Sequence, residues 1–130
     1  ELCAHNVVDF MPGQSGESQK GVTLRLGSYP GRIKEGSRME AYYGTGLVYE
    51  RHRHRYELNN QYRREMEQAG LVISGTSPDD RLAEAVELPD HPFFIGVQFH
   101  PEFKSRPNQS HPLFKGFISA ALERAEGKEV

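Results

Sequence analysis

The sequence contains little of what marks disulfide-rich, membrane-spanning or nucleic-acid-binding proteins. It has a single cysteine, Cys3, and no tryptophan. One cysteine excludes an internal disulfide and is typical of a reducing compartment, so a cytoplasmic location is expected. No apolar run approaches the roughly 18 to 20 residues that a membrane span needs. The formal net charge is only −2, so total charge favours neither nucleic acid nor an anionic membrane as a partner.

The length of 130 residues suffices for one modest domain with its own core, but not for two. We therefore expect a single domain over residues 1–130. The chain begins with Glu1-Leu2-Cys3, without a methionine or any start signal. From this we expect a piece of a longer protein, incomplete at its amino-terminal side.

Hydrophobic patterning predicts more strands than helices. Residues 22–29 alternate apolar and polar side chains, as in a half-buried strand, and a turn is expected at Pro30-Gly31. Residues 93–99 are mostly apolar and follow the breakers Pro89 and Pro92, which predicts a buried strand. Further strands or extended segments are expected over residues 7–11, 47–57, 71–75 and 82–88. The pattern is that of a sheet-rich α/β domain.

Capping residues predict three helices. Ser37 and Glu40 fit a capping box, in which Glu40 reaches back to the Ser37 amide, and Gly44 ends this short helix. Asn59 or Asn60 caps a second helix, which Gly70 ends. The third helix is expected to be capped by Ser110, with Pro112 in its first turn and a wide apolar stripe after it.

A histidine and a glutamate, His100 and Glu102, follow the strand expected at 93–99. Side chains two residues apart in an extended segment share a face, so the two can lie side by side. A carboxylate that accepts the Nδ1 proton leaves Nε2 free to take a proton from a nucleophile. The pair is therefore two thirds of a nucleophile–His–acid triad. The plain alternative is a surface ion pair, because no nucleophile stands next to it.

Residues 51–55 read Arg-His-Arg-His-Arg. This run could hold phosphates, but acidic residues flank it and an extended strand sends neighbouring cations to opposite faces. As a zinc site it offers only His52 and His54, with Cys3 far away in the sequence. The simpler interpretation is a solvent-exposed strand edge whose charges discourage aggregation.

Two stretches resemble a known family. Residues 97–102, Val-Gln-Phe-His-Pro-Glu, resemble the signature that closes the catalytic site of class I (triad) glutamine amidotransferases. The longer string over 96–107 and the run over 51–57 are similar to the CTP synthases within that family. Residues 23–27 are similar to a run of the same CTP synthases, although Val22 stands where that run begins with a glycine. Other matching stretches are 69–75, 87–94 and 111–117, so the resemblance runs from about residue 7 to residue 122.

The resemblance implies a flavodoxin-like α/β fold with the site at strand ends, of which this chain is the sheet-rich carboxy-terminal part. It implies that His100 is general base and acid for a cysteine, and that Glu102 orients it. Arg53 would pair with the α-carboxylate of glutamine, and a guanidinium fork offers a bidentate grip that lysine cannot copy. Glu1 aligns loosely with a glutamate that contacts the amino group of glutamine.

One departure from the family is large. Its nucleophile stands on a Gly-x-Cys-x-Gly elbow, and the sequence contains no such elbow. Cys3 has no glycine nearby, so we expect an ordinary cysteine there. These 130 residues alone are therefore not expected to hydrolyse glutamine.

For the whole enzyme the resemblance implies two half-reactions. Glutamine is hydrolysed through a cysteinyl thioester, and the ammonia passes to an amino-terminal synthetase domain. There UTP, activated by ATP with Mg²⁺, is aminated to CTP. GTP is implied as an allosteric activator and a homotetramer as the assembly, whereas no metal or cofactor is expected in this chain itself.

Two other hypotheses stay open. The chain could belong to a class I amidotransferase of another pathway, which shares the His-Pro-Glu ending but not the run over 51–55. It could also be a non-catalytic binding or scaffold module derived from such an enzyme, since it has no elbow cysteine.

Overall fold

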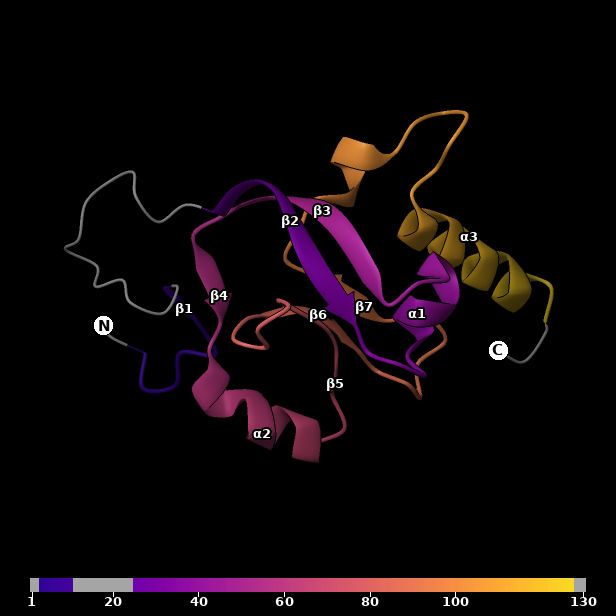
Figure 1. Cartoon of the computed structure of the whole chain (residues 1–130). Helices are drawn as coiled ribbons and strands as arrows, with labels where there is room; N and C mark the ends of the chain where they lie inside the picture. Colours follow the sequence, from indigo (N-terminus) through magenta and orange to yellow (C-terminus); the bar gives the residue numbers. More distant parts are fainter. Residues whose placement is uncertain (1–2, 11–24, 128–130) are drawn as a thin grey trace.

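The computed structural model describes residues 3–10 and 25–127, and within these ranges strands outnumber helices (Figure 1). The strands are β1 (Val8–Phe10), β2 (Arg25–Ile33), β3 (Leu47–His54), β4 (Tyr56–Leu58), β5 (Val72–Thr76), β6 (Ala83–Glu87) and β7 (Ile95–Val97). The helices are α1 (Arg38–Tyr43), α2 (Asn60–Gln68), α3 (Pro112–Ala125) and the 3₁₀ turn η1 (Pro101–Lys104). The predicted sheet-rich α/β class is confirmed. None of the described helices is long and apolar enough to cross a membrane.

A five-stranded sheet in the order β3-β2-β5-β6-β7 forms the body of the structure, and each neighbouring pair in it is antiparallel. The longest pairing joins β2 and β3, from Arg25 opposite His54 to Arg32 opposite Leu47. The short strands β1 and β4 form a separate antiparallel pair. Helices α1 and α3 pack against each other at one end of the β2–β3 pair, and α2 lies at the opposite side, next to β5 (Figure 1).

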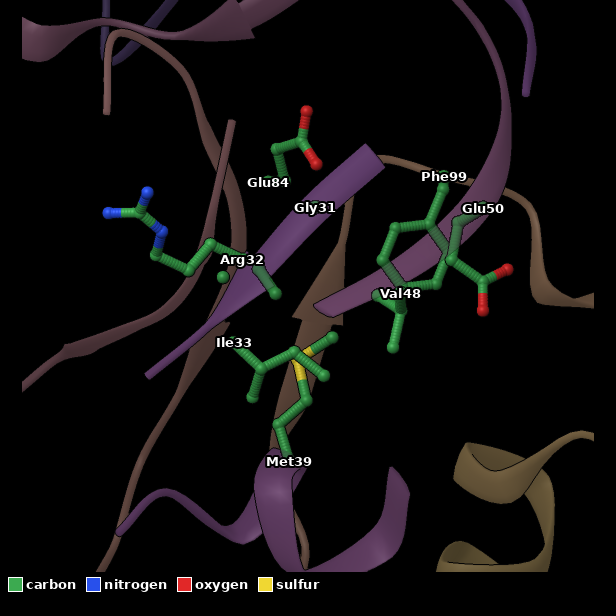
Figure 2. Close-up of a pocket in the computed structure, with 10 residues that line it drawn as sticks. Gly31, Arg32, Ile33, Met39, Val48, Glu50, Glu84 and Phe99 are labelled. Carbon is green, nitrogen blue, oxygen red and sulfur yellow. The ribbon is translucent and has the colours of Figure 1, made fainter. Parts of the chain in front are cut away.

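The core lies where α1 and α3 meet this sheet. Met39 of α1 is only 1% exposed and packs among apolar side chains of the strands and of α3. The buried members of this cluster are Ile33, Met39, Val48, Ala85, Phe99 and Leu113. Figure 2 shows a small interior cavity beside it, lined by Met39, Val48 and Phe99 together with the carboxylate-bearing Glu50 and Glu84. Two glutamates and Arg32 therefore border this cavity beside its apolar lining residues.

The turn expected at Pro30-Gly31 is wrong, because β2 runs straight through both residues to Ile33. Pro30 lies opposite Tyr49 of β3, whereas on its other side β2 pairs with β5 only at Arg32 and Ile33. Pro30 thus occupies a position with a neighbouring strand on one side only, where the missing amide donor is tolerated.

The helix ends follow the sequence with two corrections. Ser37 caps α1 and Gly44 ends it in the left-handed region, but the Glu40 carboxylate accepts from the Gly36 amide at 2.8 Å, not from Ser37. Asn59 caps α2 by accepting from the Gln61 amide. For α3 the expected cap Ser110 is wrong: the His111 side chain caps the helix by accepting from the Leu113 amide at 3.2 Å.

The predicted strand at 93–99 is shorter than expected. Only Ile95–Val97 form β7, and all three residues are half-buried. These residues are half-buried because β7 is an edge strand of the described sheet and pairs there with β6 alone. The extended segment expected at 47–57 is likewise divided, into β3 and β4, by an interruption at Arg55.

Gly75 on β5 provides a test of how closely the sheet is packed. A Cβ added there would lie 2.9 Å from the Cβ of Ala85 on β6. We expect Gly75→Ala to lower the free energy of unfolding by about 1–3 kcal/mol, the usual cost of overpacking. Urea denaturation followed by circular dichroism measures this change.

The matched control is Gly46→Ala, because a Cβ there meets nothing closer than the Ile33 carbonyl at 4.0 Å. Equal midpoints for the two variants would contradict the packing described for β5 and β6.

Candidate active site

Strand β3 carries the Arg-His-Arg-His run and separates its side chains by face. Arg51 and Arg53 are exposed, whereas His52 between them is 1% exposed. The alternation expected for an extended strand is therefore confirmed. The arginines face outward, and the imidazole of His52 points into the protein.

His100 and Glu102 form a direct pair. His100 Nδ1 donates to Glu102 Oε1 over 2.8 Å, since an ionised carboxylate can only accept. This hydrogen bond holds the pKa of Glu102 below its ordinary value. Among the described residues none hydrogen-bonds the other ring nitrogen, Nε2, and the imidazole side chain is 38% exposed.

The pair forms for a different reason than strand alternation. Strand β7 ends at Val97, His100 is an extended residue after it, and Glu102 already belongs to η1. The expectation that the two share one face of a strand is thus wrong, although the pairing itself is present. The tight turn at Pro101 brings the carboxylate back to the imidazole.

Strand β3 holds η1 at both ends. The His100 amide donates to the Arg51 carbonyl at 2.9 Å, and the Lys104 ammonium donates to the Tyr49 carbonyl. The Phe103 ring stacks on His100, with ring centroids 5.1 Å apart and planes inclined by 22°. The position of the pair relative to the arginines of β3 is therefore set by contacts of η1 and His100 with the β3 backbone.

An open pocket lies beside this junction. It is lined by Leu26, Arg51, His52, Arg53 and Phe103. The guanidinium of Arg53 makes no ion pair or hydrogen bond within the described part of the chain, so it is available to a ligand. His100 reaches this pocket through Phe103, which contacts both.

The remaining predicted positions are not brought to the pair. Glu1 lies outside the described residues. Cys3 is an exposed free cysteine whose Sγ lies 3.5 Å from the His5 carbonyl, and it makes no contact with His100. In residues 3–10 and 25–127 no three His, Cys, Asp or Glu side chains converge to form a metal site.

A buried charged network beneath the arginines was missed by sequence reasoning. Arg25 of β2 is 6% exposed and pairs with Glu84 and, at 3.8 Å, with Glu57. His52 Nε2 lies 3.9 Å from Glu84 Oε2, and His54 Nδ1 lies 3.4 Å from Glu57 Oε1. The only available signal was on β3, where Glu50, His52 and His54 occupy every second position.

The hydrogen bonds decide the tautomers of the two histidines. His54 Nδ1 donates to the Tyr56 carbonyl at 3.1 Å, so neutral His54 accepts at Nε2. The 2.7 Å contact between His52 Nδ1 and His54 Nε2 is then donated by His52. Burial, reinforced by the Arg25 charge, lowers the pKa of His52 to about 3, so both rings act as neutral hydrogen-bonding groups.

The pKa of the Glu57 carboxyl is raised, whereas the pKa values of the two histidines are lowered. Burial raises its pKa from 4.5 to about 7, and the nearby Arg25 only partly offsets that effect. Neither Glu57 oxygen has a hydrogen-bond partner among the described residues. At neutral pH this group is therefore poised between its neutral and its charged form.

Comparison with known proteins agrees with the resemblance in the sequence. The sequence model of the family "Glutamine amidotransferase class-I" matches residues 2–120. Because this match spans most of its length, the chain belongs to the class I glutamine amidotransferase family.

Within the family, the relatives it resembles are CTP synthases. The chain is 59% identical over 123 residues to the CTP synthase of Moorella thermoacetica, covering 95% of the chain and 23% of that protein. It is 60% identical over 118 residues to the CTP synthase of Listeria monocytogenes, covering 91% of the chain and 22% of that protein. The chain thus spans less than a quarter of the length of these relatives.

Two solved structures resemble the fold. The glutaminase domain of Trypanosoma brucei CTPS, with bound acivicin, matches with a TM-score of 0.84 and 37% identity, over 98% of this chain and 48% of that one. A putative GMP synthase protein from Thermoplasma acidophilum matches with a TM-score of 0.56 and 17% identity, over 82% and 49% of the two chains. The second likeness is one of fold alone.

We expect Glu57→Gln to stabilise the protein progressively as the pH rises. Folded Glu57 keeps its proton to about pH 7, whereas the unfolded carboxyl releases it near 4.5. The wild-type contribution is thus fully present below pH 4.5 and is lost as the pH rises through 7. Since glutamine does not titrate, the variant gains about 1–3 kcal/mol over wild type between pH 4.5 and 8. Urea denaturation of both proteins across this range measures the difference.

The control is Glu65→Gln on the exposed α2, for which we expect no such trend. A difference between Glu57→Gln and wild type that stays constant with pH would show that folded Glu57 titrates normally.

Proposed function

We propose that this chain is the carboxy-terminal part of the glutaminase domain of a CTP synthase. In this scheme a Cys-His-Glu triad hydrolyses glutamine, with the cysteine supplied from outside these residues. The ammonia serves the ATP-dependent amination of UTP to CTP. The observation that carries the proposal is the 2.8 Å pair of His100 and Glu102, joined through Phe103 to a pocket that presents Arg53, whose guanidinium has no ion pair among the described residues.

The proton transfers follow from the tautomer. Glu102 accepts a hydrogen bond from the Nδ1–H of His100, so Nε2 of the neutral ring carries a lone pair. Nε2 takes the thiol proton, and the thiolate attacks the side-chain amide carbon of glutamine. The resulting imidazolium returns a proton to the leaving ammonia, and the thioester that remains is hydrolysed by water with His100 again as base. Glu102 stabilises the imidazolium in both halves of the reaction.

Arg53 supplies the anchor for the substrate. Its exposed guanidinium in the pocket can bind the α-carboxylate of glutamine through two parallel hydrogen bonds. Such a grip fixes the distance from the carboxylate end of the substrate to the amide that reacts near His100. Glu1 remains a proposed contact to the substrate amino group.

The other components of the reaction belong to the rest of such an enzyme. ATP and Mg²⁺, together with UTP, would be bound by the amino-terminal synthetase domain. GTP as activator, a homotetrameric assembly and a cytoplasmic location are part of the same proposal.

A second candidate is a non-catalytic module derived from an amidotransferase. It is favoured by one observation, that the lone cysteine stands outside any elbow and does not contact His100. Grafting distinguishes the two. The 130 residues replace the matching segment of the Moorella thermoacetica CTP synthase, and CTP formation is assayed with glutamine and with ammonia. A graft active with ammonia but not with glutamine would favour the non-catalytic module.

In the grafted enzyme we expect His100→Ala to reduce glutamine-dependent CTP formation by about 100-fold or more, because the general base is lost. Ammonia-dependent CTP formation should remain, since it bypasses the triad. Both rates are followed by the absorbance change from UTP to CTP.

The matched control is His91→Ala, which removes an exposed histidine from the loop before β7. If His100→Ala abolished both activities, His100 would be structural and the proposed role would be wrong.

Arg53→Lys tests the substrate anchor. We expect the KM for glutamine to rise about tenfold with a smaller change in kcat, because lysine retains the charge but loses the bidentate contact. Arg32→Lys, another exposed strand arginine, serves as the control. An unchanged KM in Arg53→Lys would remove this residue from the binding site.

A further inference from the structure

Phe103 has an arrangement that the proposed chemistry does not yet explain. Large apolar side chains are usually buried in an apolar core. The Phe103 side chain is instead 50% exposed, and its ring lies against a polar imidazole. Its plane lies 22° from that of His100, with centroids 5.1 Å apart, so the two rings are stacked with an offset.

The same ring is a wall of the pocket that presents Arg53. The other lining residues come from β2 and β3, and Phe103 is the member of the pocket contributed by η1. One side chain therefore contacts both the imidazole and the space in which the substrate would lie.

One main-chain hydrogen bond and one side-chain contact hold the η1 turn that carries the ring. The Phe103 amide donates to the His100 carbonyl at 3.1 Å, and the next residue, Lys104, is tied to the Tyr49 carbonyl of β3. Pro101 at the start of η1 restricts the turn further. The turn therefore places the Phe103 backbone beside His100, and the ring lies against the imidazole from there.

We propose that Phe103 is a positioning residue for His100 and an apolar wall of the glutamine pocket, an inference that rests on the proposed function. Within residues 3–10 and 25–127 the imidazole is held at its edge by one hydrogen bond, from Nδ1 to Glu102, about which it can still tilt. A ring stacked on its face restricts that tilt and directs Nε2. The aromatic face also carries negative potential, which stabilises the imidazolium formed when His100 takes the thiol proton.

A second histidine–phenylalanine pair at the same spacing provides a matched control. His91 and Phe94 are also three residues apart, and Phe94 is 43% exposed. Their rings lie at 73° with centroids 6.0 Å apart, and neither residue lines the pocket of Arg53. Sequence spacing alone therefore does not produce a stack.

The stack is tested first by NMR on the 130-residue chain itself. An aromatic ring over an imidazole shifts the ring protons of that histidine upfield. We expect Phe103→Leu to move the His100 ring-proton resonances downfield by a few tenths of a ppm. Phe103→Tyr, which keeps an aromatic ring, and Phe94→Leu, which lies outside the stack, should leave these resonances at their original positions. Unchanged His100 resonances in Phe103→Leu would overturn the inference without bearing on the proposed function.

The catalytic consequence is tested in the grafted CTP synthase. We expect Phe103→Leu to lower the kcat of glutamine hydrolysis about tenfold, as misplacement of a catalytic group does, with a smaller change in KM. Phe103→Tyr and Phe94→Leu should both keep the kcat of the unsubstituted graft. A rise in KM alone would overturn the positioning role. No glutamine-dependent activity in the unsubstituted graft would overturn the proposed function, and the catalytic role of Phe103 with it.

Discussion

The pairing of β2 with β3 is the constraint on which the site depends. It runs from Arg25 opposite His54 to Arg32 opposite Leu47, and a one-residue slip would exchange the two faces of β3. In the observed register Arg53 faces the open pocket and His52 faces the interior. The same strand offers its carbonyls at Tyr49 and Arg51 to η1. One pairing thus determines where the substrate anchor and the histidine–glutamate pair stand relative to each other.

The inner face of this pairing carries charge where an apolar core would be simpler. Arg25 is buried with Glu84 and Glu57, and His52 is kept neutral beside them. Taking these groups out of water is costly, and their mutual attraction offsets the cost only with close geometry. The network therefore adds little to the stability of the fold. It does destabilise any other register, because a slip of β3 would leave buried charges without partners.

The histidine–glutamate pair of the candidate site was predictable because its residues are close in the sequence. His100 and Glu102 were named from local sequence and Arg53 from the family resemblance, and the structure pairs the first two and places Arg53 in a pocket lined by Phe103. Arg25 was not recognised because its partners lie on segments far apart in the chain. Phe103 was not recognised because the η1 turn was not predicted, and the pocket that it lines is formed by β2 and β3. A phenylalanine in sequence predicts burial, and nothing local shows that its ring will cover an imidazole.

The sequence by itself determined most of the element types, two of the three α-helix caps, the alternation of β3 and the family. These depend on period, capping chemistry and short motifs, which act over a few residues. Only the tertiary structure decided that β2 continues through Pro30, because that depends on β5 pairing no further than Arg32. It likewise decided that His111, not Ser110, caps α3, since the His111 ring is fixed by Glu50 and Tyr43 from other elements. Long-range neighbours choose among options that local chemistry leaves equal.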